Sequence, residues 1–147
     1  MRVRTAPAVA MTLALAACAP GASTSTTVQV GATLEFDIEV ASSAQEQRDG
    51  LSGRTELDEG TGMLFTFDQP GEKQVWMAGM TIPLDVAWIV DDQVLAVDTL
   101  DPCTQVDQDQ CPRWTSPADV DALLEVPAGS LDGIAPGVLV TVESVRH

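Results

Sequence analysis

Acidic side chains set among apolar residues are the groups in this sequence best suited to chemistry. Asp85 follows a Pro-Leu pair at the start of an apolar run, where a carboxylate usually needs a partner. An ion pair with a basic residue such as Arg113 would be the structural explanation. In the functional alternative, Asp85, Arg113 and Trp114 form the rim of a cleft with Trp76. Such a rim would bind a small polar ligand through charge and ring stacking.

Carboxylate pairs raise the alternative of hydrolysis. Asp85 and Asp98, with Glu125 in the same acidic set, could act as acid and base on glycans of the cell envelope. A concave pocket with two carboxylates about 5–10 Å apart would favour such a hydrolase, whereas a solid interior would favour a binding module. We assign no catalytic residue from the sequence.

Two groups of side chains could hold metals. Trp76, Met77 and Met80 resemble the soft set that binds Cu(I), but methionines on strands more often fill a core. Asp101, Asp107 and Asp109 could gather Ca²⁺, although their spacing does not match an EF-hand. We therefore expect a solvated acidic loop and predict neither a metal nor a cofactor.

The cysteines indicate an exported protein. Of three cysteines, Cys103 and Cys111 remain once Cys18 is assigned to a lipid, and an even remainder predicts a disulfide between them. A zinc site is the competing interpretation and would need about two more ligands. The single histidine is the terminal His147, which is also a poor base for Ser/His or Cys/His catalysis.

The N-terminal segment has the layout of a secretory signal peptide. Arg2 and Arg4 precede the apolar stretch 6–16, which is too short to span a bilayer, since a spanning helix needs roughly 20 residues. Leu-Ala-Ala before Cys18 resembles the bacterial lipobox, whose cysteine is lipidated and becomes the new N-terminus. The alternative is an ordinary signal peptide with a chance cysteine. We predict a lipoprotein signal peptide over 1–17 and an extracytoplasmic protein attached through Cys18 to the cell membrane, or to the outer membrane if the source has one.

The charge excludes one class of partner. The 147-residue chain has a formal net charge of −15, and removal of 1–17, which contains two arginines and no acid, makes it −17. A surface this acidic repels nucleic acids and anionic lipid head groups. We expect no nucleic-acid binding, a membrane contact made by the lipid alone, and a monomer.

The rest of the sequence predicts one β domain. Residues 18–27 are predicted to be the lipidated N-terminus and a disordered linker, and 28–147 a single domain. Ser43 and Glu46 fit a capping box that opens a short helix. Residues 68–71 are predicted as a turn, 91–93 as a hairpin turn and 101–117 as a loop. The predicted strands lie at 34–40, 63–67, 73–77, 84–90, 94–99, 120–126 and 138–142. This pattern predicts a mostly β fold, a β-sandwich or jelly-roll-like barrel with one or two short helices.

Six ordered motifs resemble one family. They are Arg-Asp-Gly-Leu-Ser-Gly-Arg at 48–54, Gly-Met-Leu-Phe at 62–65, Trp-Met at 76–77, Ile-Pro-Leu-Asp at 82–85, Cys-Pro at 111–112 with Ser-Pro at 116–117, and Leu-Glu-Val-Pro-Ala-Gly at 124–129. The chain resembles the bacterial and archaeal domain-of-unknown-function 192 family over about 34–143. It departs from the family's Trp-Met-Lys-Asn-Thr by having Ala78, Gly79 and Met80. The resemblance implies a compact β fold and brings no established activity.

Together these features predict a lipid-anchored binding or interaction module of the cell envelope. Its partner would be a small polar ligand or an envelope protein. The carboxylate-dependent hydrolase and the copper-handling protein remain as alternatives.

Overall fold

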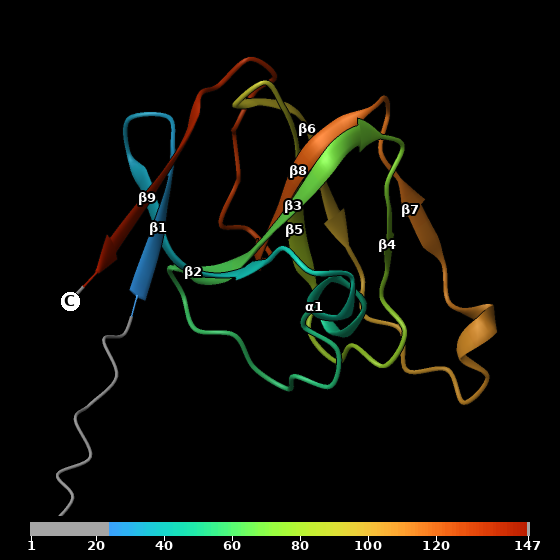
Figure 1. Ribbon diagram of the computed structural model, residues 1–147. Helices are drawn as coiled ribbons and strands as arrows, with labels where there is room; N and C mark the ends of the chain where they lie inside the picture. Colours follow the sequence, from blue (N-terminus) through green and yellow to red (C-terminus); the bar gives the residue numbers. More distant parts are fainter. Residues whose placement is uncertain (1–23, 147) are drawn as a thin grey trace, which may run out of the picture.

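The computed structural model describes residues 24–146, and at its centre a seven-stranded sheet curls into a half-barrel (Figure 1). The strand order is β6-β5-β8-β3-β2-β1-β9, and β4 and β7 form a separate two-stranded sheet. The strands are β1 (Thr24–Val30), β2 (Leu34–Ala41), β3 (Thr61–Gly71), β4 (Gln74–Trp76), β5 (Leu84–Val90), β6 (Gln93–Leu100), β7 (Arg113–Thr115), β8 (Val120–Pro127) and β9 (Val140–Arg146). The helices are α1 (Ala44–Asp49) and the single 3₁₀ turn η1 (Gln108–Gln110). The mostly β prediction is confirmed.

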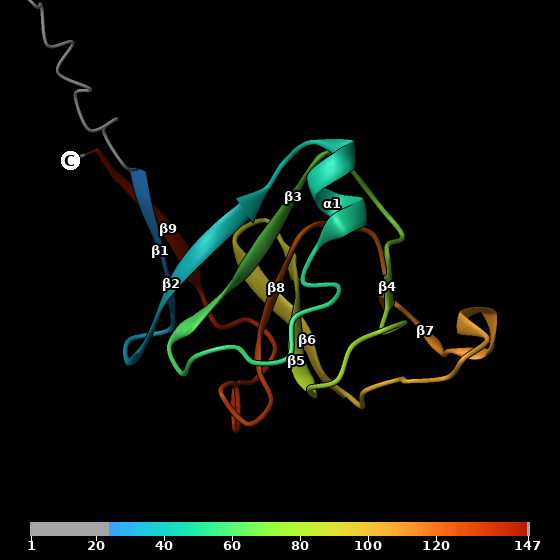
Figure 2. The ribbon, with the colours of Figure 1, turned by 90° about the horizontal axis from the view of Figure 1, so that it is seen from below.

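The helix α1 belongs to the connection between β2 and β3, which is the one parallel pair among the described strands. The predicted capping box is present: Glu46 N–H donates to Ser43 Oγ at 3.2 Å, and Ser43 N–H donates to Glu46 Oε2 at 2.8 Å. The backbone donor of Ser43 lowers the pKa of Glu46, because it stabilises the charged carboxylate. In Figure 2, α1 lies beside β3, on the side of the sheet toward β4.

Several boundaries differ from the sequence prediction. β1 begins at Thr24, inside the predicted linker, because it pairs with β2 and β9 and buries Val28 and Val30. β7 lies within the predicted loop 101–117, and β3 continues through the predicted turn 68–71, with a register shift against β8. The predicted signal peptide and Cys18 lie outside the described residues, as does His147.

The predicted hairpin between β5 and β6 is confirmed. Asp91 and Asp92 both have positive φ, 49° and 57°. A two-residue turn with φ above zero at both positions has the twist that joins antiparallel strands directly. Asp91 N–H also donates to the Asp121 carboxylate of the neighbouring β8 at 3.1 Å.

Alternate residues of the central strands face two separate apolar clusters. Phe65 of β3 and Leu123 of β8 are cross-strand partners in one cluster, whereas Leu64 and Leu124 are partners in the other. This is the period-two alternation of a sheet that is buried on both faces. The first cluster, which we call the β4-side cluster, includes residues from the 51–57 loop, β4 and the disulfide segment. The second is completed by β1, β2, β9 and the turn after β8.

Gly62 permits close approach of β3 to β8. A Cβ built at this position would collide with the backbone carbonyl oxygen of Glu125. Only glycine therefore fits where the two strands meet. None of the helices within residues 24–146 is long and apolar enough to cross a membrane.

Candidate functional site

Asp85, a predicted binding residue, is buried and hydrogen-bonded within the fold. It is 1% exposed, and its carboxylate accepts hydrogen bonds from Thr99 Oγ1 at 2.7 Å and from the backbone N–H groups of Gly129 and Leu131 at 2.8 and 2.9 Å. The expected partner Arg113 is not among these donors. The correction has a simple reason: the turn after β8 presents two free N–H groups to the start of β5, and a buried carboxylate satisfies both. Asp98 also has a partner within its own sheet, since it accepts from Trp88 Nε1 at 2.7 Å.

Trp76 and Arg113, the next two predicted binding residues, do lie together. They are paired across β4 and β7, and the Arg113 guanidinium stacks on the Trp76 ring at 4.1 Å from its centroid. Trp76 is 40% exposed. Trp114 pairs with Val75 instead and packs half-buried against the β4-side cluster. Of the four predicted binding residues, the structure therefore brings Trp76 and Arg113 together and places Asp85 and Trp114 in the packing of the fold.

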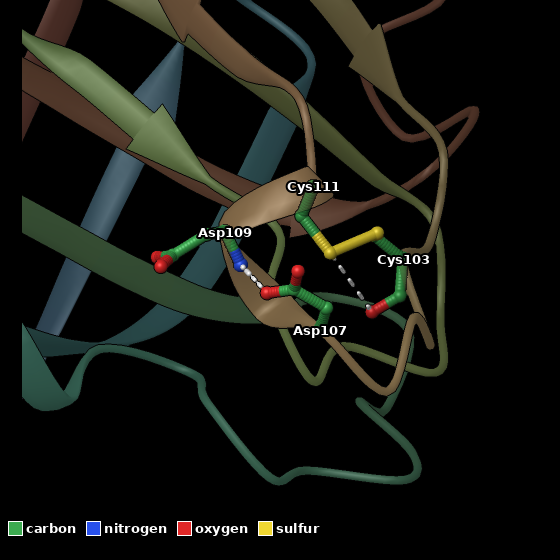
Figure 3. The surroundings of a disulfide bond; sticks show 4 residues. All are labelled: Cys103, Asp107, Asp109 and Cys111. Carbon is green, nitrogen blue, oxygen red and sulfur yellow. Dashed lines mark hydrogen bonds between the residues drawn. A yellow bond between two sulfur atoms is a disulfide. The ribbon is translucent and has the colours of Figure 1, made fainter.

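The predicted disulfide between Cys103 and Cys111 is present (Figure 3). Asp107 caps the turn η1 that precedes Cys111, and its carboxylate accepts from Asp109 N–H at 3.2 Å. Within the part of the chain that the structure describes, there is no group of three or more His, Cys, Asp or Glu side chains placed to hold a metal ion. A disulfide of this kind is typical of proteins that fold outside the reducing cytoplasm.

A pocket of about 660 Å³ lies between α1, β4 and the face of the sheet that carries the β4-side cluster. We call it the α1–β4 pocket. Its volume is in the range of small-molecule sites. Its walls are mostly apolar and include Phe65, Val75, Met77, Met80, Leu84 and Leu123.

Met77 and Met80 come together at the edge of this pocket through a tight turn. Met80 N–H donates to the Met77 carbonyl at 3.0 Å, and Gly79 between them has φ of 75°. Positive φ at the third position is typical of a type II turn and favours glycine there. Because both methionines are nearly fully buried and belong to the β4-side cluster, they serve as core residues as well as pocket lining.

Glu125 of β8 also lines the α1–β4 pocket, and its surroundings are unusual for an acid. It is 6% exposed, and its cross-strand neighbours are Met63 on β3 and Val86 on β5. The described residues provide no hydrogen bond or salt bridge to its carboxyl group, so burial alone raises the pKa of Glu125 to about 8. Since no described side-chain oxygen or nitrogen is both sealed and unpartnered, the Glu125 oxygens keep contact with the space of the pocket.

Basic side chains stand at the mouth of the same pocket. Arg48 of α1 and Lys73 before β4 both line it, and Arg113 is stacked on the lining residue Trp76. Asp49 is the one other acid of the lining, and both of its oxygens accept from Gln45 Nε2 at 2.8 and 2.9 Å. With Glu125 protonated, the pocket has a positive mouth in a protein whose net charge is −15.

A second groove, of about 480 Å³, lies between β2 and the 54–58 segment. Its acids are exposed, and its arginine, Arg54, is in a salt bridge with Glu39 at 2.8 Å. Its charged groups are in contact with solvent or paired, whereas Glu125 in the α1–β4 pocket is 6% exposed, so the α1–β4 pocket is the better candidate for a binding site.

From the sequence, Glu125 is placed in an acidic set with Asp85 and Asp98 and assigned no separate role, although a signal for one is present. It is the single acid within the otherwise apolar run 122–128. An acid flanked on both sides by residues of a buried strand must either find a partner or stay protonated. Whether such an acid finds a hydrogen-bond partner is decided by segments that are distant in sequence. The sequence of 122–128 alone could therefore not show that Glu125 differs in this respect from Asp85.

The comparisons with known proteins agree with this fold. A family model, DUF192, described as "Uncharacterized ACR", matches residues 26–142. A protein of unknown function from Novosphingobium aromaticivorans DSM 12444 is 30% identical, with a TM-score of 0.69 over 78% of this chain and 83% of that chain. A putative transcription regulator from Sinorhizobium meliloti 1021 is 21% identical, with a TM-score of 0.71 over 84% of this chain and 97% of that chain, a likeness of fold alone. No curated protein matches the sequence.

Proposed function

Because this protein belongs to the DUF192 family, whose description assigns no activity, its function must be inferred from its own residues, and we propose that it is a binding module that takes a small molecule into the α1–β4 pocket. The observation that carries the proposal is the Glu125 carboxyl, buried and without a protein partner in an apolar pocket. A group in this position destabilises the fold unless something else uses it. A ligand with an apolar body and one polar atom would supply the missing hydrogen bond.

We further propose that the module works outside the cytoplasm, attached to a membrane through a lipid on Cys18. The support is the lipobox-like sequence before Cys18 together with the disulfide between Cys103 and Cys111. The disulfide connects the segments on either side of η1 and so steadies the loop next to Arg113. A small ligand of the envelope is then the natural partner.

The glycan hydrolase is a second candidate, favoured by one observation. A carboxylic acid that stays protonated at neutral pH is what a general acid requires, and Glu125 has this property. The pocket's other carboxylate, Asp49, is held by Gln45 on the rim. Hydrolysis of a glycan by the wild type that is lost in both Glu125→Gln and Asp49→Asn would replace the binding proposal with this one.

The binding proposal can be tested with a neutral apolar fluorophore, N-phenyl-1-naphthylamine. We expect saturable binding to one site on the wild-type domain, retained in Glu125→Gln and weakened several-fold in Glu125→Leu, which cannot form a hydrogen bond. Glu143→Leu, on exposed β9, is the matched control and should bind like the wild type. Absence of saturable binding to the wild type, or equal weakening in the control, would overturn the proposal.

The pH dependence provides an independent readout of the same site. Above the raised pKa of about 8, Glu125 becomes charged, and an apolar probe must then share the pocket with a carboxylate. Binding should therefore fall as the pH rises through about 8 in the wild type. It should stay level in Glu125→Gln, which has no proton to lose.

A further inference from the structure

The charged side chains around the α1–β4 pocket indicate the charge of its ligand. The volume and walls of the pocket indicate only the ligand's size and apolar character. The whole sequence contains 7 basic and 22 acidic residues, so most basic groups should find an acidic partner. Among the described side chains of residues 25–144 the structure shows one salt bridge, between Arg54 and Glu39, and it lies at the other groove. The three remaining basic side chains of residues 25–144 are Arg48, Lys73 and Arg113. Arg48 and Lys73 line the α1–β4 pocket, and Arg113 stacks on the lining residue Trp76.

These three cations have neutral partners only. Arg48 donates to the Gln45 side-chain oxygen at 2.9 Å, and Lys73 lies over the Phe67 ring at 4.3 Å from its centroid. Lys73 also donates to the Gln69 carbonyl at 3.5 Å, and Arg113 stacks on Trp76. Such contacts hold the charged groups in place without neutralising them. An anion arriving at the pocket would therefore meet two positioned cations, Arg48 and Lys73, and one carboxylate, Asp49, which is already held by Gln45.

We infer that the ligand of the α1–β4 pocket is an anionic amphiphile, with its anionic group at Arg48 and Lys73 and its apolar body against Phe65, Leu123 and the floor at Glu125. This inference rests on the proposed binding function and names its ligand class. The field of the whole chain repels anions, so an anion is bound where local cations gather and little elsewhere. The neutral acid at the floor suits the apolar end, because it adds no negative charge inside the pocket.

The test compares two probes that differ by one group. 1-Anilinonaphthalene-8-sulfonate is N-phenyl-1-naphthylamine with a sulfonate added, so their affinities isolate the contribution of the anion. We expect the anionic probe to bind the wild type more tightly than the neutral probe at low salt. Its affinity should decrease as salt rises from 0.01 to about 0.5 M, while that of the neutral probe stays nearly constant.

Single charge removals then locate the anion. Arg48→Gln and Lys73→Gln should each weaken the anionic probe about two- to fivefold and weaken the neutral probe much less. Arg54→Gln removes the same charge at the other groove and is the matched control, expected to bind both probes like the wild type. Equal losses in all three variants would mean that net charge alone is at work, and would overturn the inference.

The two proposals fail in different ways. If neither probe binds saturably, the binding function itself is wrong. If the neutral probe binds and the anionic probe binds no better, the pocket is a binding site and the anionic ligand class is wrong. Displacement by dodecanoate, by dodecyl phosphate or by both supports the inference and identifies the head group, whereas equal displacement by uncharged dodecanol overturns it.

Discussion

Replacing Glu125 by Gln should stabilise the protein at alkaline pH and have little effect in acid. The two side chains have nearly the same shape, so the substitution changes the ability to ionise and little else. In the folded protein, burial raises the pKa of Glu125 from the ordinary value of 4.5 to about 8. Glutamine removes this ionisation, and with it the cost of burying a charge.

The size of the effect follows from the two pKa values. Between pH 4.5 and about 8 the unfolded chain has released the Glu125 proton and the folded chain has kept it. The unfolded state then binds fewer protons, so the free energy of unfolding falls by about 1.4 kcal/mol for each pH unit. The loss starts as the pH rises through 4.5, is complete above about 8 and amounts to roughly 5 kcal/mol. That is comparable with the whole stability of a small domain.

Urea denaturation of the wild type and of Glu125→Gln at pH 5 and pH 8.5 measures this difference. We expect similar midpoints at pH 5 and a variant that is more stable by several kcal/mol at pH 8.5. Glu143→Gln removes an acid from the exposed surface of β9 and controls for the change in net charge. Asp49, Arg48 and Lys73 line the same pocket, and both variants leave them intact. Parallel pH profiles for the wild type and Glu125→Gln would refute the claim that the carboxyl is buried without a partner.

Four further predictions concern the fold and the anchor. Replacing Cys103 and its partner by Ala should lower the free energy of unfolding by roughly 2–3 kcal/mol in urea titrations, and an unchanged midpoint would contradict the stabilising role of the disulfide. Gly62→Ala should destabilise by about 1–3 kcal/mol, because its methyl group meets the carbonyl oxygen of a neighbouring strand; wild-type stability would mean that β3 and β8 can separate freely. Asp85→Ala should cost about 2–4 kcal/mol, since it leaves the buried N–H of Leu131 and the part-buried N–H of Gly129 without an acceptor, and a thermal melt like that of the wild type would count against this. Cys18→Ala should be lost from the membrane fraction of cells or stay unprocessed, and membrane retention of a correctly processed variant would remove the lipid anchor.

The strands could be predicted because their signals are local. The alternation of apolar and acidic residues predicted β2 to within one residue of its observed bounds. The two aspartates before Gln93 predicted the hairpin between β5 and β6. The capping box at Ser43 needed four residues of sequence and no tertiary contact. β1 and β7 were missed because their residues are polar or short, and pairing with distant strands decides their conformation. The β-propensity of the residues predicts a strand poorly where pairing with a neighbouring strand decides the conformation.

The candidate site could be predicted only in part, for a related reason. The sequence indicated Trp76 and Arg113 as candidate binding residues, and the structure pairs them across β4 and β7. The sequence also indicated Asp85 as a candidate binding residue, because an acid near the start of an apolar strand could lie at the rim of a cleft. The turn after β8, forty-four or more residues later, is what satisfies that carboxylate. No pattern near Asp85 records this contact.

The two buried acids of the central sheet differ in their hydrogen-bond partners, and this difference supports the proposed binding site. Asp85 accepts three hydrogen bonds from the fold, so it is fully used in holding β5 to the turn after β8. Glu125 accepts none and lies between a methionine and a valine. Stability alone would favour an apolar residue or a glutamine there, because a charge or an unused carboxyl in such a place lowers the free energy of unfolding. The fold therefore tolerates a cost in a pocket that Arg48 and Lys73 also line, and the ligand that we propose would account for both features.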